Sequence, residues 1–310
     1  MFDAVCAGIL CADVLAKPVN ELPQKGKLEL IDDLKLQIGG CASNAAIDLS
    51  RMGVRTAILG KIGNDGFGDF IKEGMSKENI DITGLKTADD IQTSASVVAI
   101  NKDGERSILH CLGANSRFCF EDIDLDILND SKLLFIAGTF LMPSLDGEGT
   151  LKLLEAGRRA GAITSMDTAW DSTGSWIKKI EGSISLLDWF MPSYDEAVML
   201  SGQRDPEKIA LDFSRKGARN IVIKLGGEGC FVKPFDSPGF YSPAFKVDTI
   251  DTSGAGDAFC AGFITGIIKG WETAECARYA NAAGAACVSA IGTTSGIRDF
   301  DQIREIMDEK

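Results

Sequence analysis

Histidine is almost missing from this chain of 310 residues, because His110 is its only one. One histidine cannot form a histidine metal cluster, and no Gly-x-Ser-x-Gly segment offers a serine nucleophile to pair with it. Paired cysteines are missing as well. The nine cysteines stand singly, without a Cys-x-x-Cys pair, at Cys6, Cys11, Cys41, Cys111, Cys119, Cys230, Cys260, Cys276 and Cys287. This pattern predicts reduced thiols in a cytoplasmic protein rather than a disulfide framework or a zinc site.

Basic side chains and long apolar runs are also scarce. The 32 Lys and Arg are outnumbered by 45 Asp and Glu, and the net charge is -13. Because nucleic-acid phosphates need clustered cations, a nucleic-acid partner is not expected. No apolar run approaches the roughly 20 residues that span a bilayer. The apolar start, Met1 to Leu10, contains Asp3 and no basic residue, so we expect a first strand and no membrane association.

The apolar residues that are present alternate between strand-like and helix-like segments. Strands are predicted at Thr56 to Ile62, Leu133 to Ala137, Ala162 to Asp167, Trp189 to Pro192 and Ile221 to Leu225. Such alternation is typical of an α/β protein with a mostly parallel sheet and right-handed crossovers. With 45% hydrophobic residues, the chain can bury the core of one large domain over residues 1–310.

Two segments, residues 14–38 and 93–111, do not follow this alternation. They contain short β-like runs at Leu28 to Ile31, Leu34 to Ile38, Ala95 to Ile100 and Arg106 to Cys111, with a hairpin turn predicted at Asn101 to Gly104. We therefore expect them to form a small separate sheet inserted in the domain. A small sheet cannot bury both of its faces alone, so a closing motion or a partner subunit is expected to cover it.

The segment Asp251 to Phe259 (DTSGAGDAF) places glycines and a carboxylate where a helix begins. Apolar residues then recur with helical spacing at Phe259, Phe263, Ile264, Ile267 and Ile268. Amides in a first helical turn lack partners, so Gly254, Ala255 and Gly256 suit a bound phosphate. A carboxylate beside phosphate is a poor ligand but a suitable base for an attacking hydroxyl, which favours this role for Asp257 over a simple helix cap.

A second turn of this kind lies far upstream, where Gly39, Gly40 and Asn44 precede an apolar helical face that ends at Gly53. Alone, it is equally typical of a strand-to-helix turn in which Asn44 bonds to its own helix. Together, the two motifs resemble the C-terminal and N-terminal signatures of the ribokinase-like sugar kinases, also called the phosphofructokinase-B family. The downstream signature matches at every position of Asp251 to Asp257 that the family defines.

The resemblance implies a ribokinase-like three-layer α/β/α fold, in which the small sheet is a lid over the sugar and pairs with its counterpart in a homodimer. It implies that Asp257 is the catalytic base and that the amides of Gly254, Ala255 and Gly256 stabilise the transferred phosphoryl group. It also assigns the acceptor sugar to one set of residues and the nucleotide to another. The sugar set is Asp13, Gly39, Gly40, Asn44 and Asn115, and the nucleotide set is Lys224, Gly226, Gly229, Asn281 and Ser193.

Two segments depart from the family pattern. The family's Asn-x-x-Glu, which positions Mg²⁺ through water, is here Ser193 to Glu196, so Ser193 replaces the asparagine. The family's Asp-x-Asn-x-Arg is here Asp167 to Asp171, without the asparagine or the arginine. The second departure leaves the roles of Asp167 and Asp171 open and suggests a substrate without negative charge near this strand. The resemblance also implies a possible K⁺ site at Asp251 and the loop Gly292 to Gly296.

The sequence therefore predicts an ATP- and Mg²⁺-dependent kinase that phosphorylates a hydroxymethyl group of a small sugar or sugar acid. A P-loop kinase is excluded, since Gly-x-x-x-x-Gly-Lys-[Ser/Thr] is absent. One alternative is a nucleoside kinase of the same superfamily, with Phe118, Phe120 or Trp170 beside the base. A nucleotide-binding oxidoreductase fits less well, because the third glycine of the dinucleotide-binding motif is missing. A sugar or nucleotide sensor without catalysis is the remaining alternative, and the intact Asp257 argues against it.

Overall fold

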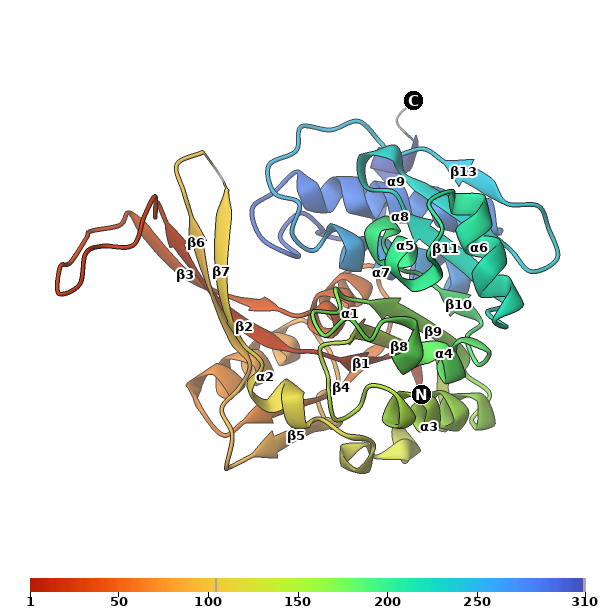
Figure 1. Cartoon of the computed structure of the whole chain (residues 1–310), viewed down its shortest axis with the longest axis horizontal. Coiled ribbons are helices and arrows are strands. Elements are labelled where there is room, and N and C mark those ends of the chain that lie inside the picture. The colour runs from red at the N-terminus through yellow and green to blue at the C-terminus, as the bar shows by residue number, and fades with distance from the viewer. Residues whose placement is uncertain (104, 309–310) are drawn as a thin grey trace.

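The computed structural model describes residues 1–103 and 105–308, which form one large sheet, one small sheet and the surrounding helices (Figure 1). The large sheet has nine strands. In spatial order they are β13 (Phe240–Ser242), β12 (Cys230–Lys233), β11 (Asn220–Lys224), β10 (Trp189–Phe190), β9 (Ile163–Thr168), β8 (Ser131–Thr139), β1 (Phe2–Gly8), β4 (Thr56–Gly63) and β5 (Leu85–Ala88). Pairing is parallel from β11 to β5, whereas β12 and β13 are antiparallel at one edge.

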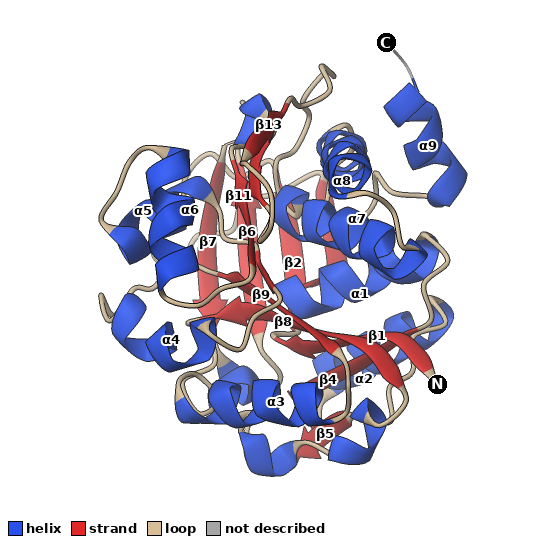
Figure 2. Cartoon of the chain, turned by 90° about the vertical axis from the view of Figure 1, so that its right-hand side faces the viewer, coloured by secondary structure: helices blue, strands red, loops and turns tan. Residues whose placement is uncertain are grey.

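Helices cover both faces of this sheet, which gives three layers (Figure 2). One layer contains α1 (Cys41–Arg51), α2 (Gly66–Lys77), α7 (Ala255–Lys269), α8 (Thr273–Val288) and α9 (Phe300–Asp308). The other contains α3 (Glu148–Arg159), α4 (Ile177–Ile184), α5 (Tyr194–Ser201) and α6 (Pro206–Arg215). The predicted α/β architecture with a mostly parallel sheet is confirmed.

The strands between the layers are apolar on both faces. In β1, Ala4 and Cys6 point into the core on one side, and Val5 and Ala7 point into the core on the other. All four are completely buried. This continuous apolar character distinguishes the strand from one with a solvated face, and is the reason that the first strand could be predicted from sequence.

The small sheet lies beside this body and has the order β3 (Asp33–Gly39), β2 (Cys11–Lys17), β6 (Ala95–Ile100) and β7 (Arg106–Cys111). The prediction was right for β6 and β7 and placed β3 within one residue, but it missed the strand that begins at Cys11. The predicted strand at Leu28 to Ile31 is wrong. That segment has no strand partner, and Leu28 and Leu30 are exposed. The predicted hairpin turn includes Gly104, which lies outside the described residues.

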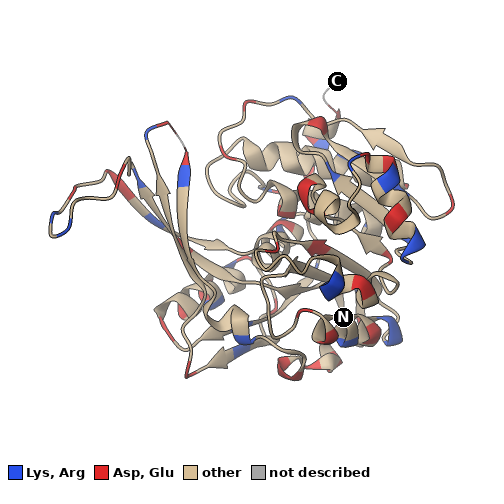
Figure 3. Cartoon of the chain, viewed as in Figure 1, with Lys and Arg blue, Asp and Glu red and all other residues tan. Residues whose placement is uncertain are grey.

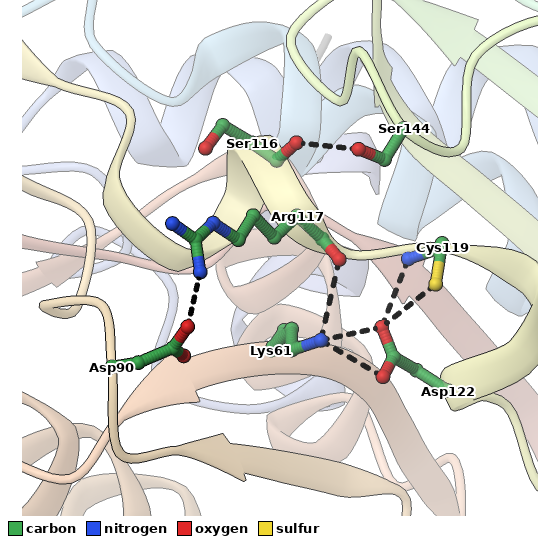
Figure 4. A network of polar contacts seen from close by, with 7 residues as sticks. All are labelled: Lys61, Asp90, Ser116, Arg117, Cys119, Asp122 and Ser144. Atoms are coloured by element: carbon green, nitrogen blue, oxygen red, sulfur yellow. Dashed lines mark hydrogen bonds and ion pairs between the residues drawn. The ribbon is translucent and has the colours of Figure 1, made fainter.

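Polar contacts fix the chain at the base of the small sheet. Asp65 caps α2 by accepting from Gly68 N, and its other oxygen accepts from Thr93 N just before β6. After β7 the chain forms the 3-10 turn η1 (Gly113–Arg117). There Lys61 of β4 donates to the backbone oxygen of Arg117 and to both oxygens of Asp122 (Figure 4). Both ends of the β6–β7 hairpin are therefore attached to β4 and its surroundings.

Charged side chains of both signs are interspersed along the elements in the view of Figure 3. The helices of residues 1–103 and 105–308 include none with the length and apolar character required for a membrane span.

Candidate active site

The site is built around the start of α7. Gly254 is the N-cap of this helix and has a left-handed φ of 76°. A Cβ at Gly254 would collide with the backbone of Thr293, so both the conformation and the space require glycine here. The first helical hydrogen bond runs from Ala258 N to Gly254 O. The amides of Gly256 and Asp257 precede that bond and therefore have no helical acceptor.

Asp257 lies in the first turn of α7 and is held from a distant part of the chain. Asn44 of α1 donates from Nδ2 to Asp257 Oδ2 over 2.8 Å, across 213 residues of sequence. Burial raises the pKa of the Asp257 carboxyl, while the Asn44 amide and the ammonium of Lys224 act in the opposite direction. Asn44 thus bonds to the carboxylate of α7 and not to its own helix. A carboxylate of raised pKa in a buried site is typical of a general base.

Lys224 and Asp167 form a buried ion pair next to this carboxylate. They lie at the ends of β11 and β9, on either side of the short strand β10, with Nζ 2.6 Å from Oδ2. Burial raises the pKa of Asp167 to about 7, against the effect of Lys224. Burial lowers the pKa of Lys224, but the neighbouring acidic groups, Asp167 first, outweigh burial and leave it above its usual value. Lys224 therefore keeps its positive charge beside Gly256.

A cavity of about 780 Å³ opens at this point. The turn of Gly254 to Gly256, Asp257 and Lys224 line one part of it, and the loop around Phe245 and Val247 lines another. The predicted nucleotide residues Ser193, Lys224, Gly226, Gly229 and Asn281 all line this one cavity. Its volume lies within the range of small-molecule and cofactor sites.

The glycine turn and Asn281 shape the walls of the cavity. Gly226 and Gly229 have φ values of 59° and 97°, and a Cβ at Gly229 would collide with the backbone of Ser242. Asn281 of α8 donates from Nδ2 to Ser242 O and to Pro243 O. This amide therefore orders the chain that follows β13 (Phe240–Ser242), where the cavity wall continues.

Glu196 and Ser193 meet at the start of α5. Glu196 Oε2 accepts from Ser193 N over 3.0 Å and from the Thr168 hydroxyl over 2.9 Å. The carboxylate thus closes the first turn of the helix and also lines the cavity. Within the described residues no group of three or more His, Cys, Asp or Glu side chains could hold a metal ion by itself. A single carboxylate fits Mg²⁺ held mainly by phosphates and water.

The predicted acceptor residues Asp13, Gly39, Gly40 and Asn44 lie where β2 and β3 meet the start of α1. Asp13 of β2 rests against Gly39, where a Cβ would collide with its carboxylate. Gly40 follows as the N-cap of α1, with a φ of 97°, and leads to Asn44 and its bond to Asp257. Across the small sheet, Asp13 is in register with Gln37, Ser96 and His110, which form one polar row.

Asn115 is engaged in another way. Its amide donates to Leu10 O over 2.8 Å and accepts from Leu10 N over 3.2 Å, and the residue is buried. Both ends of the side chain are used to fix the chain between β1 and β2, so we do not propose it as a sugar ligand. Phe118 is also core, whereas Trp170 is half exposed and lines the cavity.

Asp251 is occupied by groups of this chain. Arg106 of β7 forms an ion pair with Asp251, and the amides of Ser253 and Gly292 donate to its two oxygens. Burial raises the pKa of Asp251, but Arg106 and these amides outweigh it and hold the pKa below its usual value. A guanidinium already balances this carboxylate, so we do not propose a K⁺ ion there. Asp171 caps the turn before α4 by accepting from Thr173 N and Trp176 N.

Sequence reasoning missed three contacts of this site: the Asp167–Lys224 pair, the reach of Arg106 from the small sheet to Asp251, and the thiol of Cys260, which lies 3.7 Å from Lys224 Nζ. The ion pair left one signal, because Asp167 and Lys224 are both polar residues at the ends of apolar strands. In open α/β sheets the carboxyl ends of strands form the ligand site.

A family model described as pfkB family carbohydrate kinase matches residues 1–299. The chain belongs to the pfkB family of carbohydrate kinases. Among relatives, it is 30% identical to 2-dehydro-3-deoxygluconokinase of Bacillus subtilis (strain 168) over 293 residues, covering 91% of this chain and 90% of that protein. This membership confirms the family inferred from the two signatures.

Solved structures of the family share the fold over the full chain. The Arabidopsis thaliana ribokinase complexed with ribose and ATP aligns with a TM-score of 0.87 at 21% identity, covering 100% of this chain and 99% of that one. A putative ribokinase II from E. coli in complex with ATP and Mg²⁺ aligns with a TM-score of 0.87 at 21% identity, covering 100% of both chains. At this level of identity the likeness establishes the ribokinase-like fold.

Proposed function

We propose that this pfkB family member is an ATP-dependent kinase that phosphorylates a hydroxymethyl group of a small sugar or sugar acid. The observation that carries the proposal is the position of Asp257. Its carboxylate lies in the first turn of a helix, between the amide of Asn44 and the side of the cavity that holds Lys224. The proposed base and the turn proposed to bind the phosphoryl group therefore line the same cavity.

The chemistry assigned to these groups is a single phosphoryl transfer. Asp257 takes the proton of the acceptor hydroxyl as the oxygen forms its bond to the γ-phosphorus, and the bond to ADP breaks. The amides of Gly254 and Gly256 at the start of α7 stabilise the charge of the transferred group, together with the positive end of the helix. The Ala255 amide would first have to leave its backbone acceptor, Thr252 O. Lys224 supplies a fixed positive charge on the phosphate side.

Mg²⁺ and ATP fit the residues of the cavity. Glu196, with Ser193 beside it, would hold the ion through water, and the phosphates would supply its remaining ligands. When bound, Mg²⁺ neutralises phosphate charge. The E. coli relative was solved with ATP and Mg²⁺. The turn at Gly226 and Gly229 and the helix face at Asn281 would frame the nucleotide.

Asp13 is proposed to hold two hydroxyls of the acceptor, with Gly39 and Gly40 giving the sugar access to the backbone. Replacing Asp13 with alanine should raise the KM for the acceptor by roughly 10- to 100-fold, because a charged hydrogen bond contributes about 1.5 to 3 kcal/mol. The KM for ATP should hardly change. Steady-state kinetics with each substrate varied in turn measure both values. An equal rise in the two KM values would remove Asp13 from the acceptor site.

The acceptor class is the part of the proposal that a screen can settle directly. The Bacillus subtilis relative is a 2-dehydro-3-deoxygluconokinase, which supports including sugar acids beside neutral sugars. ADP release should be measured with unphosphorylated sugars, sugar acids, nucleosides and sugar phosphates. We expect turnover with at least one unphosphorylated sugar or sugar acid. A clear preference for nucleosides would favour the nucleoside kinase alternative, and a preference for sugar phosphates would contradict the proposal.

The small sheet, formed by β3, β2, β6 and β7, is proposed to be the lid of a single domain over residues 1–310 and to carry a homodimer interface. It extends beyond the predicted segment 14–38 at both ends, to Cys11 and to Gly39. One face bears the polar row with Asp13. The opposite face bears an apolar row in which Leu36, Val14, Val97 and Leu109 are in register, and Leu109 is 70% exposed. A second copy would cover this row with its own. The free thiols of all nine cysteines support a cytoplasmic location.

Substituting Leu109 with lysine should therefore convert a dimer into a monomer, since it places a charge in the middle of the proposed interface. Leu211 of α6 is also exposed, at 45%, and lies outside the small sheet, so Leu211→Lys is the matched control. Sedimentation velocity of both variants and the unmodified protein measures the change. A monomeric unmodified protein, or a Leu109→Lys variant that stays dimeric, would contradict this interface.

A further inference from the structure

Helix α1 buries three oxygen atoms that have no hydrogen-bond partner within residues 1–103 and 105–308. They are Oδ1 of Asn44 and both carboxylate oxygens of Asp48. Asp48 is completely buried, and Asn44 is 3% exposed. Buried polar atoms without a partner are rare in folded proteins, and a buried unpaired charge is costly. The pair therefore needs a physical explanation.

The two side chains stand one helical turn apart. Residues at i and i+4 lie on the same face of a helix, with about 5 to 6 Å between their Cβ atoms, so the two polar ends can reach each other. The other end of Asn44 is fixed, because Nδ2 donates to Asp257 Oδ2. The unpaired Asn44 Oδ1 is thus the end available to the next turn of α1.

Among the described residues, no basic side chain forms an ion pair with Asp48. Arg51, on the same helix, donates to both oxygens of Glu78 and to the backbone oxygens of Thr294 and Ile297. Glu78 and Asp257 are negative. Another titratable neighbour, Cys287 of α8, directs its thiol at two backbone oxygens, those of Ser253 and Thr293.

One proton satisfies the unpaired groups. An ionised carboxylate only accepts hydrogen bonds, and so does an amide oxygen, which means that neither can bond to the other. A neutral carboxylic acid has one O–H donor, which suits Asn44 Oδ1. Burial raises the pKa of Asp48 well above its usual value, Arg51 opposes this, and Asp257 and Glu78 add to it.

We propose that Asp48 is a neutral carboxylic acid that donates its proton to Asn44 Oδ1 and thereby holds the Asn44 amide toward Asp257. Asp48 is a positioning residue, since it acts on the base through Asn44. Its effect on catalysis rests on the proposed role of Asp257. Without the donor, the amide can rotate by half a turn and present its oxygen to the carboxylate, which would repel Asp257 from its position.

Two variants of Asp48 separate this role from packing. Asp48→Asn keeps the shape and an N–H donor at every pH, whereas Asp48→Leu keeps a similar volume without a donor. We expect Asp48→Leu to lower kcat by about 10- to 100-fold, the effect of losing a hydrogen bond that positions a reacting group. The KM for ATP should stay unchanged. Asp48→Asn should restore kcat to within a few-fold. In an Asn44→Ala background, Asp48→Leu should have little further effect on kcat.

Protonation itself is tested without catalysis. At pH 8, where Asp167 is mainly ionised, the infrared difference spectrum between the unmodified protein and Asp48→Asn should contain the carbonyl band of one neutral carboxylic acid. Because the folded pKa is raised above the unfolded value near 3.8, the stability of the unmodified protein should fall relative to Asp48→Asn as pH rises above about 4. Below that pH the two should differ little.

Each of these measurements has an outcome that would contradict one part of the proposal. A difference spectrum without this acid band, or parallel stability curves for the unmodified protein and Asp48→Asn, would show that Asp48 is not a neutral acid. An unchanged kcat in folded Asp48→Leu, or an Asp48→Asn variant as slow as Asp48→Leu, would overturn the positioning role. The spectroscopic and stability results remain valid if Asp257 is not the base, so a failure of that assignment is recognised separately.

Discussion

Replacing Asp257 with asparagine is expected to lower kcat by on the order of 10²- to 10⁴-fold, the usual contribution of general base catalysis. The change keeps the size of the side chain and an oxygen that can accept from Asn44, but it removes the ability to take a proton. Sugar and ATP should still bind. Affinity for ATP is expected to stay the same or to rise, because a negative charge next to the phosphates has been removed. Single-turnover phosphoryl transfer measures the chemical step directly.

A role in helix capping alone gives the opposite pattern. Losing a cap costs about 1 kcal/mol of stability, while turnover per folded molecule would be kept. Thermal unfolding and single-turnover transfer should therefore be measured on the same preparation. Transfer within tenfold of the unmodified protein, together with a lowered melting temperature, would defeat the assignment of Asp257 as the base.

Replacing Asp167 with alanine is expected to reduce the free energy of unfolding by about 3 to 5 kcal/mol, because it leaves the Lys224 ammonium buried without its partner. The pair is almost inaccessible to solvent, with side chains 11% and 4% exposed. Denaturant titration at pH 8 measures the loss, since the pKa of Asp167 is about 7 and its carboxylate is mainly ionised there. Because the folded pKa of Asp167 is raised above the unfolded value of 3.8, the stability that this carboxyl contributes falls as pH rises from about 4 to about 7, so the difference should be larger at pH 5 than at pH 8.

The double variant Asp167→Leu, Lys224→Met is the control for this interpretation. Replacing both charges with apolar groups removes the unpaired ammonium, so most of the lost stability should return. The exposed pair Glu73–Lys77 is a second control, because solvent screens it and Glu73→Ala should have little effect. If Asp167→Ala costs no more than Glu73→Ala, the buried pair does not contribute as proposed.

Short-range patterns explain what could be predicted for the fold. Strands β6 and β7 were predicted at their observed bounds from their apolar runs. The prediction holds because both runs also find partner strands in the small sheet. Leu28 to Ile31 has a similar composition but no neighbouring strand, and it is not a strand. The antiparallel strands β12 and β13 were missed. Strand formation depends on pairing, which a local pattern cannot report.

The candidate site likewise has features that local sequence predicts and features that depend on distant contacts. The turns at Gly40 and Gly254 could be read from sequence because each combines glycine with the start of an apolar helix face, and both glycines have positive φ. Asn115 was assigned to the sugar because its segment resembles a family turn, but its amide bonds to Leu10 at a separation of 105 residues. A K⁺ site was likewise expected at Asp251, because the sequence does not show that Arg106 of the small sheet forms an ion pair with this carboxylate.

The sequence by itself determined the family, the alternation of strands and helices, and the identity of the carboxylate in the turn at Gly254. These features depend on residues within a few positions of one another, where side-chain periodicity and glycine backbone freedom act. Only the tertiary structure decided that Asn44 meets Asp257, that Lys224 pairs with Asp167, and that Asp48 is buried behind them without a partner. Such contacts depend on strand order and helix packing, which bring together residues that are up to 213 positions apart.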